Sequence, residues 1–119
     1  MTKPIKVGVV GCGYWGPNLI RNFRALPRCQ LKTMCDTNED RLRHLGNLYP
    51  EVRRETDYHR MLKEDGLDAV IIATSVKHHF PMAKASLEAG KHTFIEKPMA
   101  ASVEQCEELV DIAENKGLV

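Results

Sequence analysis

The sequence predicts an α/β fold in which helices cover both faces of a parallel sheet. Three observations support this class. Apolar, β-branched runs alternate with segments of helical apolar spacing along the whole chain. The run over 69–73 is apolar throughout, which is typical of a strand buried on both faces. The connections between segments are short, as in units where a helix links two parallel strands.

The first half of the chain contains three predicted strands, each followed by a helix. The β-branched run over 5–10 ends at Gly11, and the helix after it carries apolar residues at helical spacing until Pro27 stops it. A strand over 30–35 ends at Asp36, and the next helix is closed by Pro50. A short polar strand over 52–55 then precedes a helix of one to two turns near 58–62.

The second half repeats this alternation. The buried strand over 69–73 is followed by a helix over about 79–88, which Gly90 ends. A strand over 92–95 comes next. Ser102 to Gln105 fits a capping box, in which two side chains satisfy the first N–H groups of a helix. That last helix carries an apolar stripe and ends at Gly117.

Size and composition fit one domain without a general affinity for polyanions. The chain has 119 residues, of which 43% are hydrophobic and 28% charged, with a net charge of +1. Near-neutrality argues against nucleic-acid or anionic-membrane binding. No apolar run approaches the roughly 20 residues that span a bilayer, and no signal peptide is apparent, so we expect a cytoplasmic location. The four cysteines fit no zinc module; we expect reduced thiols, three of them in the core.

A glycine-rich turn after the first strand predicts a dinucleotide site. The segment Gly11-Cys12-Gly13-Tyr14-Trp15-Gly16 has the pattern G-x-G-x-x-G between a strand and a helix, the context in which this pattern is informative. Gly11 permits the tight turn, Gly13 lets a pyrophosphate approach the backbone, and Gly16 lets the helix lie close to the strand. The helix N-terminus then offers free N–H groups to phosphates. A tight turn without a ligand is the alternative.

Asp36 is the second candidate cofactor residue. It ends the second strand, where a carboxylate can accept hydrogen bonds from both ribose hydroxyls of adenosine and repel a 2′-phosphate. We therefore expect NAD to be preferred over NADP. Two alternatives stay open: Asp36 caps the following helix, or Arg41 turns toward a 2′-phosphate rather than toward solvent.

Two further segments follow strands and so lie where ligands bind in open α/β sheets. Lys97, in Glu96-Lys97-Pro98, could hold a ribose hydroxyl or a substrate oxygen, or help to move a proton; a solvated lysine is the alternative. The stretch 73–79 offers hydroxyls and two histidines, His78 and His79, either of which could face the cofactor or lie at the surface. Adjacent histidines share no helix face, so we expect no metal site.

Together these motifs resemble the glucose–fructose oxidoreductase, inositol dehydrogenase and MocA (Gfo/Idh/MocA) family over the whole chain. The opening over 7–19 is similar to members that act on sugars and nucleotide sugars. The stretch Ala73–His79 matches the family's A-T-P-x-x-x-H except that Ser75 replaces the proline, and Glu96-Lys97-Pro98 matches E-K-P. The resemblance implies a Rossmann-like sheet of five strands in the order 3-2-1-4-5. It also implies an NAD(P)-dependent oxidoreductase that moves a hydride at a secondary alcohol of a sugar-like substrate.

The resemblance also implies roles for individual residues. Lys97 lies near the nicotinamide ribose and the reacting carbon in such enzymes, so we expect it to be catalytic. The expected cofactor-binding residues are Gly11, Cys12, Gly13, Tyr14, Trp15, Gly16, Asp36, Arg41, Ala73, Thr74, His79, Glu96 and Lys97.

The sequence departs from the family at its end. Family members carry a second α/β domain that supplies most substrate contacts, whereas this chain ends at Val119, where a sixth strand would begin. We expect residues 1–119 to bind the cofactor without efficient turnover, and to self-associate through the exposed edge of the 92–95 strand or through the helix that flanks it. Three other functions stay open: a non-catalytic NAD(P) or metabolite sensor, a methyltransferase, in which Glu96-Lys97-Pro98 has no role, and a purely structural α/β domain.

Overall fold

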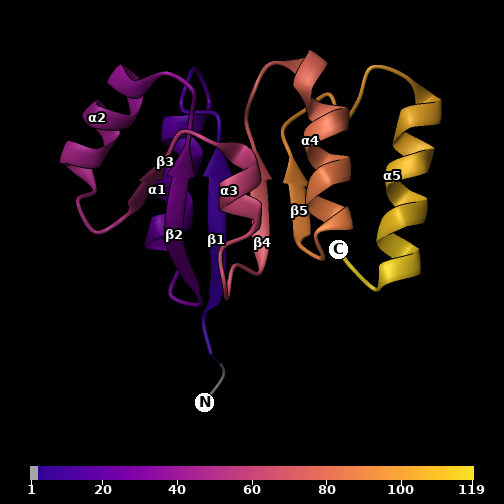
Figure 1. The fold of residues 1–119 in the computed structure, drawn as a ribbon, viewed down its shortest axis with the longest axis horizontal. Helices are drawn as coiled ribbons and strands as arrows, with labels where there is room; N and C mark the ends of the chain where they lie inside the picture. Colours follow the sequence, from indigo (N-terminus) through magenta and orange to yellow (C-terminus); the bar gives the residue numbers. More distant parts are fainter. Residues whose placement is uncertain (1–2) are drawn as a thin grey trace.

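The computed structural model describes residues 3–119 and contains one sheet of five parallel strands (Figure 1). The strands are β1 (Ile5–Val10), β2 (Cys29–Cys35), β3 (Arg53–Glu55), β4 (Ala69–Ile72) and β5 (His92–Ile95). The helices are α1 (Gly16–Ala25), α2 (Glu39–Leu48), α3 (Tyr58–Leu62), α4 (Val76–Glu88) and α5 (Val103–Lys116). The strand order is β3-β2-β1-β4-β5, which confirms the predicted Rossmann-like topology.

Helices cover both faces of the sheet, so the inner strands are buried on both sides. Figure 1 shows α1 behind the sheet and α3 and α4 in front of it. Val9 of β1 belongs to the core beneath α1 and α2, and the next residue, Val10, belongs to the core beneath α3, α4 and α5. Because successive strand residues point to opposite faces, both must be apolar, and this accounts for the continuous apolar runs.

Helix α4 begins earlier than the sequence predicts. A start near His79 would place Pro81 in the first turn, where a proline loses no helical hydrogen bond. The structure adds a turn before it: α4 begins at Val76, and the His78 N–H donates to the Ser75 carbonyl at 3.0 Å. Pro81 therefore lies inside the helix. The extra turn brings the His79 side chain into the protein interior, where it is 1% exposed.

The predicted cap of α5 is present with one difference. The Ser102 hydroxyl accepts a hydrogen bond from the Gln105 N–H at 3.2 Å, as in a capping box. The Gln105 side chain accepts from the N–H of Ala101 at 3.1 Å, one residue before the capping serine. One first-turn N–H group and one N–H group just before the cap are thus satisfied, and Gly117 ends the helix in the left-handed region.

All four cysteines are free, but only two of them are buried. Cys12 and Cys35 lie in the core, whereas Cys29 and Cys106 are partly exposed. The expectation of three core thiols is therefore wrong by one. The difference arises at Cys29, the first residue of β2, and at Cys106 in the first turn of α5, because element ends are less well covered than their centres.

Strand β5 forms an edge of the sheet, and the end of the chain lies against it. The Thr93 N–H donates to the Val119 carbonyl at 2.9 Å, and the Val119 N–H donates to His92 Nδ1 at 3.1 Å. One backbone group of this edge is therefore already paired, which leaves less of the edge for a second molecule. Self-association through β5 stays a prediction.

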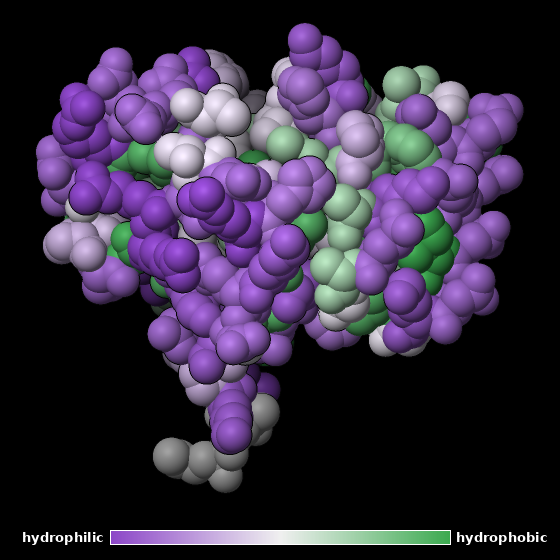
Figure 2. All heavy atoms as spheres, viewed as in Figure 1, coloured by the Kyte–Doolittle hydropathy of each residue, from purple (hydrophilic) through white to green (hydrophobic). Residues whose placement is uncertain are grey.

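The surface in view in Figure 2 is mostly hydrophilic, and apolar residues show mainly around α4 and α5. No helix within residues 3–119 is long and apolar enough to cross a membrane. The cytoplasmic location stays a prediction.

Candidate dinucleotide-binding site

The carboxyl ends of the strands, at the top of the sheet in Figure 1, border a cleft of about 580 Å³. Such a volume is ordinary for a small-molecule site. The cleft lies over β1 and β4, where the strand order reverses and where ligands bind in open α/β sheets. All of the predicted site residues except Cys12 and Gly16 line it.

The glycine turn between β1 and α1 brings backbone segments into direct contact. Gly11 has a φ of +96°, and a Cβ there would lie 2.6 Å from the Ala73 carbonyl carbon. A Cβ at Gly16 would lie 1.9 Å from the Gly11 carbonyl oxygen. No side chain fits at either place, so the first turn of α1 packs directly on the loop. This is the geometry that the glycine pattern predicts.

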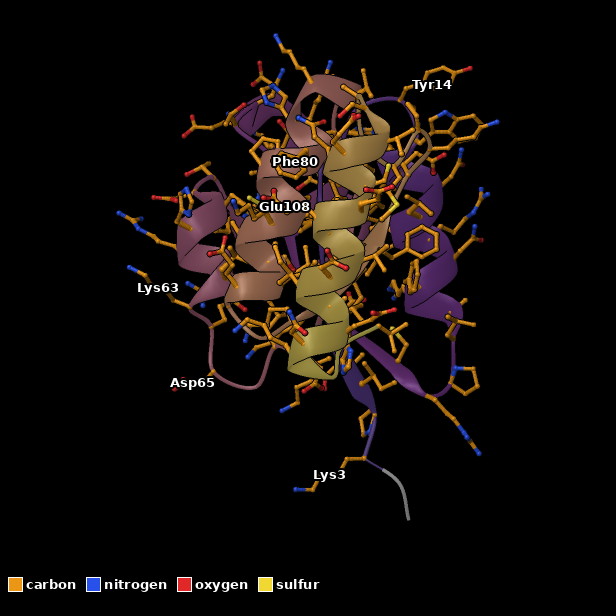
Figure 3. The ribbon with its side chains drawn as sticks, turned by 90° about the vertical axis from the view of Figure 1, so that its right-hand side faces the viewer. Lys3, Tyr14, Lys63, Asp65, Phe80 and Glu108 are labelled. Atoms are coloured by element: carbon orange, nitrogen blue, oxygen red, sulfur yellow. The ribbon has the colours of Figure 1, made fainter. Side chains whose placement is uncertain are left out.

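The N-terminus of α1 is open to an anion. Trp15 is the N-cap residue, but no side chain caps the helix and no acidic residue lies in its first turn. The first N–H groups and the positive end of the helix dipole are therefore free for a phosphate. Tyr14, 86% exposed, projects away from the body of the protein (Figure 3). Its ring meets that of Trp15 edge to face, with 5.2 Å between centroids.

Asp36 ties the end of β2 to the glycine turn. One carboxylate oxygen accepts from the Cys12 N–H at 2.7 Å, and the other accepts from the Asn38 N–H at 2.8 Å. Asn38, not Asp36, caps α2, by accepting from the Arg41 N–H at 3.1 Å. A carboxylate has about four acceptor positions, so Asp36 keeps capacity for two ribose hydroxyls.

Arg41 lies above the glycine turn, on the same side of the cleft. Its guanidinium nitrogen would be 3.1 Å from a Cβ at Gly13, so the guanidinium lies close to this residue of the loop. The cation is thus close to the place where a bound phosphate would meet the loop.

Cys12 is turned away from the cleft and is not a nucleophile. Its thiol points into the core, with Sγ 3.7 Å from the Cys35 carbonyl oxygen. Burial, reinforced by the nearby Asp36 carboxylate, raises the pKa of Cys12 to about 12, and burial likewise raises that of Cys35 to about 12. Both thiols therefore stay protonated at neutral pH, and reactivity requires the thiolate.

The turn between β4 and α4 forms the opposite wall of the cleft. Thr74 and Ser75 line it, as do His78 and His79. His79 is 1% exposed, and each of its ring nitrogens lies at hydrogen-bond distance from a backbone carbonyl: 2.8 Å from Thr74 O and 2.6 Å from Pro98 O. A direct bond from this ring to a cofactor would have to replace one of these contacts.

Lys97 reaches the cleft from the end of β5. The Glu96 N–H continues the ladder by donating to the Ile72 carbonyl at 2.9 Å, and a cis peptide bond joins Lys97 to Pro98. Lys97 is exposed, and its ammonium is in no ion pair that the structure shows for residues 3–119. It is therefore free to meet a ligand in the cleft. In the same part of the chain, no three His, Cys, Asp or Glu side chains gather as metal ligands.

Three polar residues of the cleft are not among the predicted site residues: Thr37, Thr56 and Tyr58. Thr37 follows the end of β2, and Thr56 and Tyr58 follow β3. Their position after strand ends, including the end of the short polar strand, is the signal in the sequence that indicates them. The Tyr58 hydroxyl donates to the Met82 carbonyl at 2.7 Å, and burial raises its pKa above the usual value, so it serves as a neutral donor.

A larger groove, of about 690 Å³, lies elsewhere. It is on the α1 side of β4 and β5, and its lining includes Phe23, Phe94 and Val119. Phe23 and Phe94 meet edge to face at 6.0 Å between centroids. The groove is almost wholly apolar and holds none of the predicted site residues, so the smaller, polar cleft is the better candidate for a charged cofactor.

Comparison with known proteins also indicates a domain that binds a nicotinamide cofactor. Residues 5–119 match the model of an oxidoreductase family described by its NAD-binding Rossmann fold. A curated relative, glycosyl hydrolase family 109 protein 1 of Shewanella sp. (strain MR-4), is 40% identical over 119 aligned residues, which cover 92% of this chain and 26% of the relative. The chain thus spans about a quarter of that relative's length.

Solved structures of similar fold hold nicotinamide cofactors. GenD2 from gentamicin A biosynthesis, in complex with NAD, superposes with a TM-score of 0.94 at 28% identity, covering 100% of this chain and 34% of that one. KijD10, a 3-ketoreductase from Actinomadura kijaniata in complex with TDP-benzene and NADP, has a TM-score of 0.92 at 27% identity, with 98% and 37% covered. The two cofactors leave the choice between NAD and NADP open.

The fold, the open helix end above the glycine turn and the family match over residues 5–119 agree, and the chain belongs to the Gfo/Idh/MocA oxidoreductase family as its NAD-binding Rossmann domain.

Proposed function

We propose that this chain is the cofactor-binding part of an NAD(P)-dependent dehydrogenase that acts on a secondary alcohol of a sugar or nucleotide sugar. The observation that carries the proposal is that the glycine turn, Asp36 and Lys97 all line one cleft at the carboxyl ends of the strands. The cofactor would supply the hydride acceptor or donor. The sugar-like substrate is supported by the motif resemblance and by the curated relative, which is named a glycosyl hydrolase family 109 protein. KijD10, a 3-ketoreductase, supports a reaction between a carbonyl group and an alcohol.

We propose that the glycine turn and the α1 N-terminus hold the pyrophosphate and that Asp36 accepts the adenosine ribose hydroxyls. Asp36 is already held in place by two backbone N–H groups, so it needs little reorganisation to bind. Its negative charge favours NAD over NADP because it repels a 2′-phosphate. Arg41 offsets part of this repulsion, so we expect NADP to bind more weakly rather than not at all.

Lys97 is proposed as the catalytic residue. Its ammonium can donate to a ribose hydroxyl of the cofactor or to the substrate oxygen, and it can hold or release a proton at that oxygen as the hydride moves. Its exposed position at the end of β5 is consistent with this role.

The test uses Trp15, the only tryptophan, which lines the cleft. Titration with NADH should quench its fluorescence saturably, and NADPH should bind about tenfold more weakly. Asp36→Ala should weaken NADH binding about tenfold, which is roughly 1.4 kcal/mol. It should also bring the affinities for NADH and NADPH closer together. Arg41→Ala should weaken NADPH more than NADH.

Asp40→Ala is the matched control, because it removes a carboxylate from α2 that pairs with Arg43 and lies outside the cleft. It should leave both affinities unchanged. A wild-type chain that binds neither nicotinamide cofactor by fluorescence or calorimetry would overturn the proposal. Saturable binding of S-adenosylmethionine instead would favour a methyltransferase.

We also propose that residues 1–119 bind the cofactor without efficient turnover. The chain spans 26% to 37% of the lengths of these relatives, and Lys97 is the one acid–base residue we assign to the reaction. Rapid NADH formation from a panel of sugar alcohols by this chain would contradict that part of the proposal. Binding without turnover is also what a non-catalytic sensor would show.

A further inference from the structure

We propose that His79 is a positioning residue that fixes the Lys97–Pro98 segment against the β4–α4 turn and thereby places the Lys97 ammonium in the cleft. The inference rests on the proposed function, because it assigns a purpose to the position of Lys97. His79 itself has no part in the chemistry proposed here.

The contacts of His79 join two walls of the cleft that are distant in sequence. Nδ1 lies 2.6 Å from Pro98 O, 19 residues away, and Nε2 lies 2.8 Å from Thr74 O, 5 residues away. Both partners are carbonyl oxygens, so the ring acts as a donor on either side. A neutral imidazole donates to one of them at a time, and the protonated ring donates to both.

Burial makes these contacts specific. His79 is 1% exposed, so water does not compete for its nitrogens. A buried polar group that loses its partner costs more than the bond itself contributes. The protein therefore favours the arrangement in which Pro98 O stays beside the ring.

The contact between His79 and the Pro98 carbonyl lies in the middle of the segment that carries Lys97. The neighbouring hydrogen bonds of the described chain are at the Glu96 N–H, which donates to the Ile72 carbonyl, and at the Ala101 N–H, which donates to the Gln105 side-chain oxygen. Lys97 is the residue directly before the anchored Pro98, so movement of the Pro98 carbonyl would move the Lys97 backbone as well.

The first measurement is hydrogen exchange of the cofactor-free protein, read by mass spectrometry over peptides that contain residues 96–101. We expect about tenfold faster exchange there in His79→Gln and His79→Ala, with β1 and β2 unchanged. His79→Gln keeps an amide donor and carries the test if His79→Ala does not fold. Unchanged exchange in a folded His79 variant would overturn the proposal.

The second measurement is a double-mutant cycle with Lys97→Ala, using NADH affinity from Trp15 fluorescence. If His79 acts through Lys97, His79→Gln weakens NADH binding about fivefold when Lys97 is present and has little effect in the Lys97→Ala background. Equal weakening in both backgrounds would show that His79 does not act through Lys97, and would overturn the inference.

Ser86→Ala is the control. Ser86 is in the same helix as His79 and is 0% exposed, but it lies outside the cleft. Its hydroxyl is 2.8 Å from the Thr93 hydroxyl, so the substitution also removes a hydrogen bond. We expect Ser86→Ala to lower stability without changing hydrogen exchange over 96–101 or NADH affinity. If Ser86→Ala changes exchange and affinity as much as the His79 variants do, the effect of His79 is a general loss of stability and not a local one. Failure of the wild-type chain to bind NADH would count against the proposed function, while the exchange measurement would still decide whether His79 anchors Pro98.

Discussion

The two turns that face each other across the cleft are shaped by opposite means. The β1–α1 turn depends on missing side chains, because Gly11 and Gly16 let backbone atoms approach where a Cβ would collide. The β4–α4 turn instead contains a buried side chain, His79, whose two ring nitrogens lie at hydrogen-bond distance from the Thr74 and Pro98 carbonyl oxygens. One turn is held by close backbone contact and the other by side-chain donors.

The difference explains why the sequence predicts the contacts within the first turn but not the contacts of His79 in the second. A glycine that permits close approach belongs to a pattern with fixed spacing between a strand and a helix. A histidine that binds two carbonyls, one of them 19 residues away, looks like any other histidine near the start of a helix. Perturbations at the first turn should therefore lower the free energy of unfolding most where they displace backbone and least where they remove an exposed side chain.

The largest effect is expected for Gly16→Ala. The new Cβ would lie 1.9 Å from the Gly11 carbonyl oxygen, so the backbone of the turn or of α1 must move. We expect a loss of about 3 kcal/mol or more in the free energy of unfolding, measured by urea denaturation, together with loss of NADH binding.

Gly90→Ala separates collision from backbone strain. Gly90 also has a positive φ, of +80°, but nothing lies within 4 Å of its Cβ position. It should cost only about 1 to 2 kcal/mol, the strain of a left-handed alanine. Equal losses for the two variants would show that close contact is not what shapes the first turn.

An intermediate effect is expected from alkaline pH, through the thiols beneath the first turn. Burial raises the pKa of Cys12 and of Cys35 from 9.0 to about 12. Above pH 9 the unfolded chain releases these protons while the folded chain keeps them, so the stability that is complete below pH 9 falls as the pH rises toward 12. The loss should approach about 1.4 kcal/mol per pH unit for each thiol.

Urea denaturation at pH 8 and pH 10 measures this loss, and Cys12→Ser should reduce it by the share of one thiol. The same variant compared between pH 6 and pH 8, where neither thiol titrates, provides its own control. If the decline between pH 8 and pH 10 is the same in Cys12→Ser as in the wild type, the Cys12 thiol is not the group responsible.

The smallest effect is expected for Tyr14→Ala, two residues before Gly16. Tyr14 is 86% exposed and its principal contact is the edge of the Trp15 ring. Its removal should change the free energy of unfolding by less than about 0.5 kcal/mol in thermal or urea denaturation. A loss comparable with that of Gly16→Ala would mean that side chains, not backbone contacts, shape this turn.

Much of the fold follows from local pattern. The alternation of strands and helices and the parallel sheet were predictable because each apolar run has a period and length typical of one element. The strand order was predictable only through the resemblance to a known family. The start of α4 was not predictable, because Pro81 favours a later start and the added turn is stabilised by contacts of His79 with residues outside the helix. Cys29 and Cys106 are less buried than predicted, because they lie at the ends of elements, where burial depends on neighbouring segments.

By itself, the sequence determined which residues come to the cleft. Parallel strands joined by short helical connections bring their carboxyl ends to one edge, so residues after each strand meet there whatever their separation along the chain. The glycine turn, Asp36 and Lys97 were predictable for this reason.

Only the tertiary structure decided what each side chain does at that edge. Cys12 turns into the core, Asp36 binds the backbone of the glycine turn 24 residues away, and His79 binds Pro98 rather than facing outward. The direction of a side chain depends on which donors, acceptors and apolar surfaces surround it after folding. Those partners come from distant segments, and local spacing does not encode them.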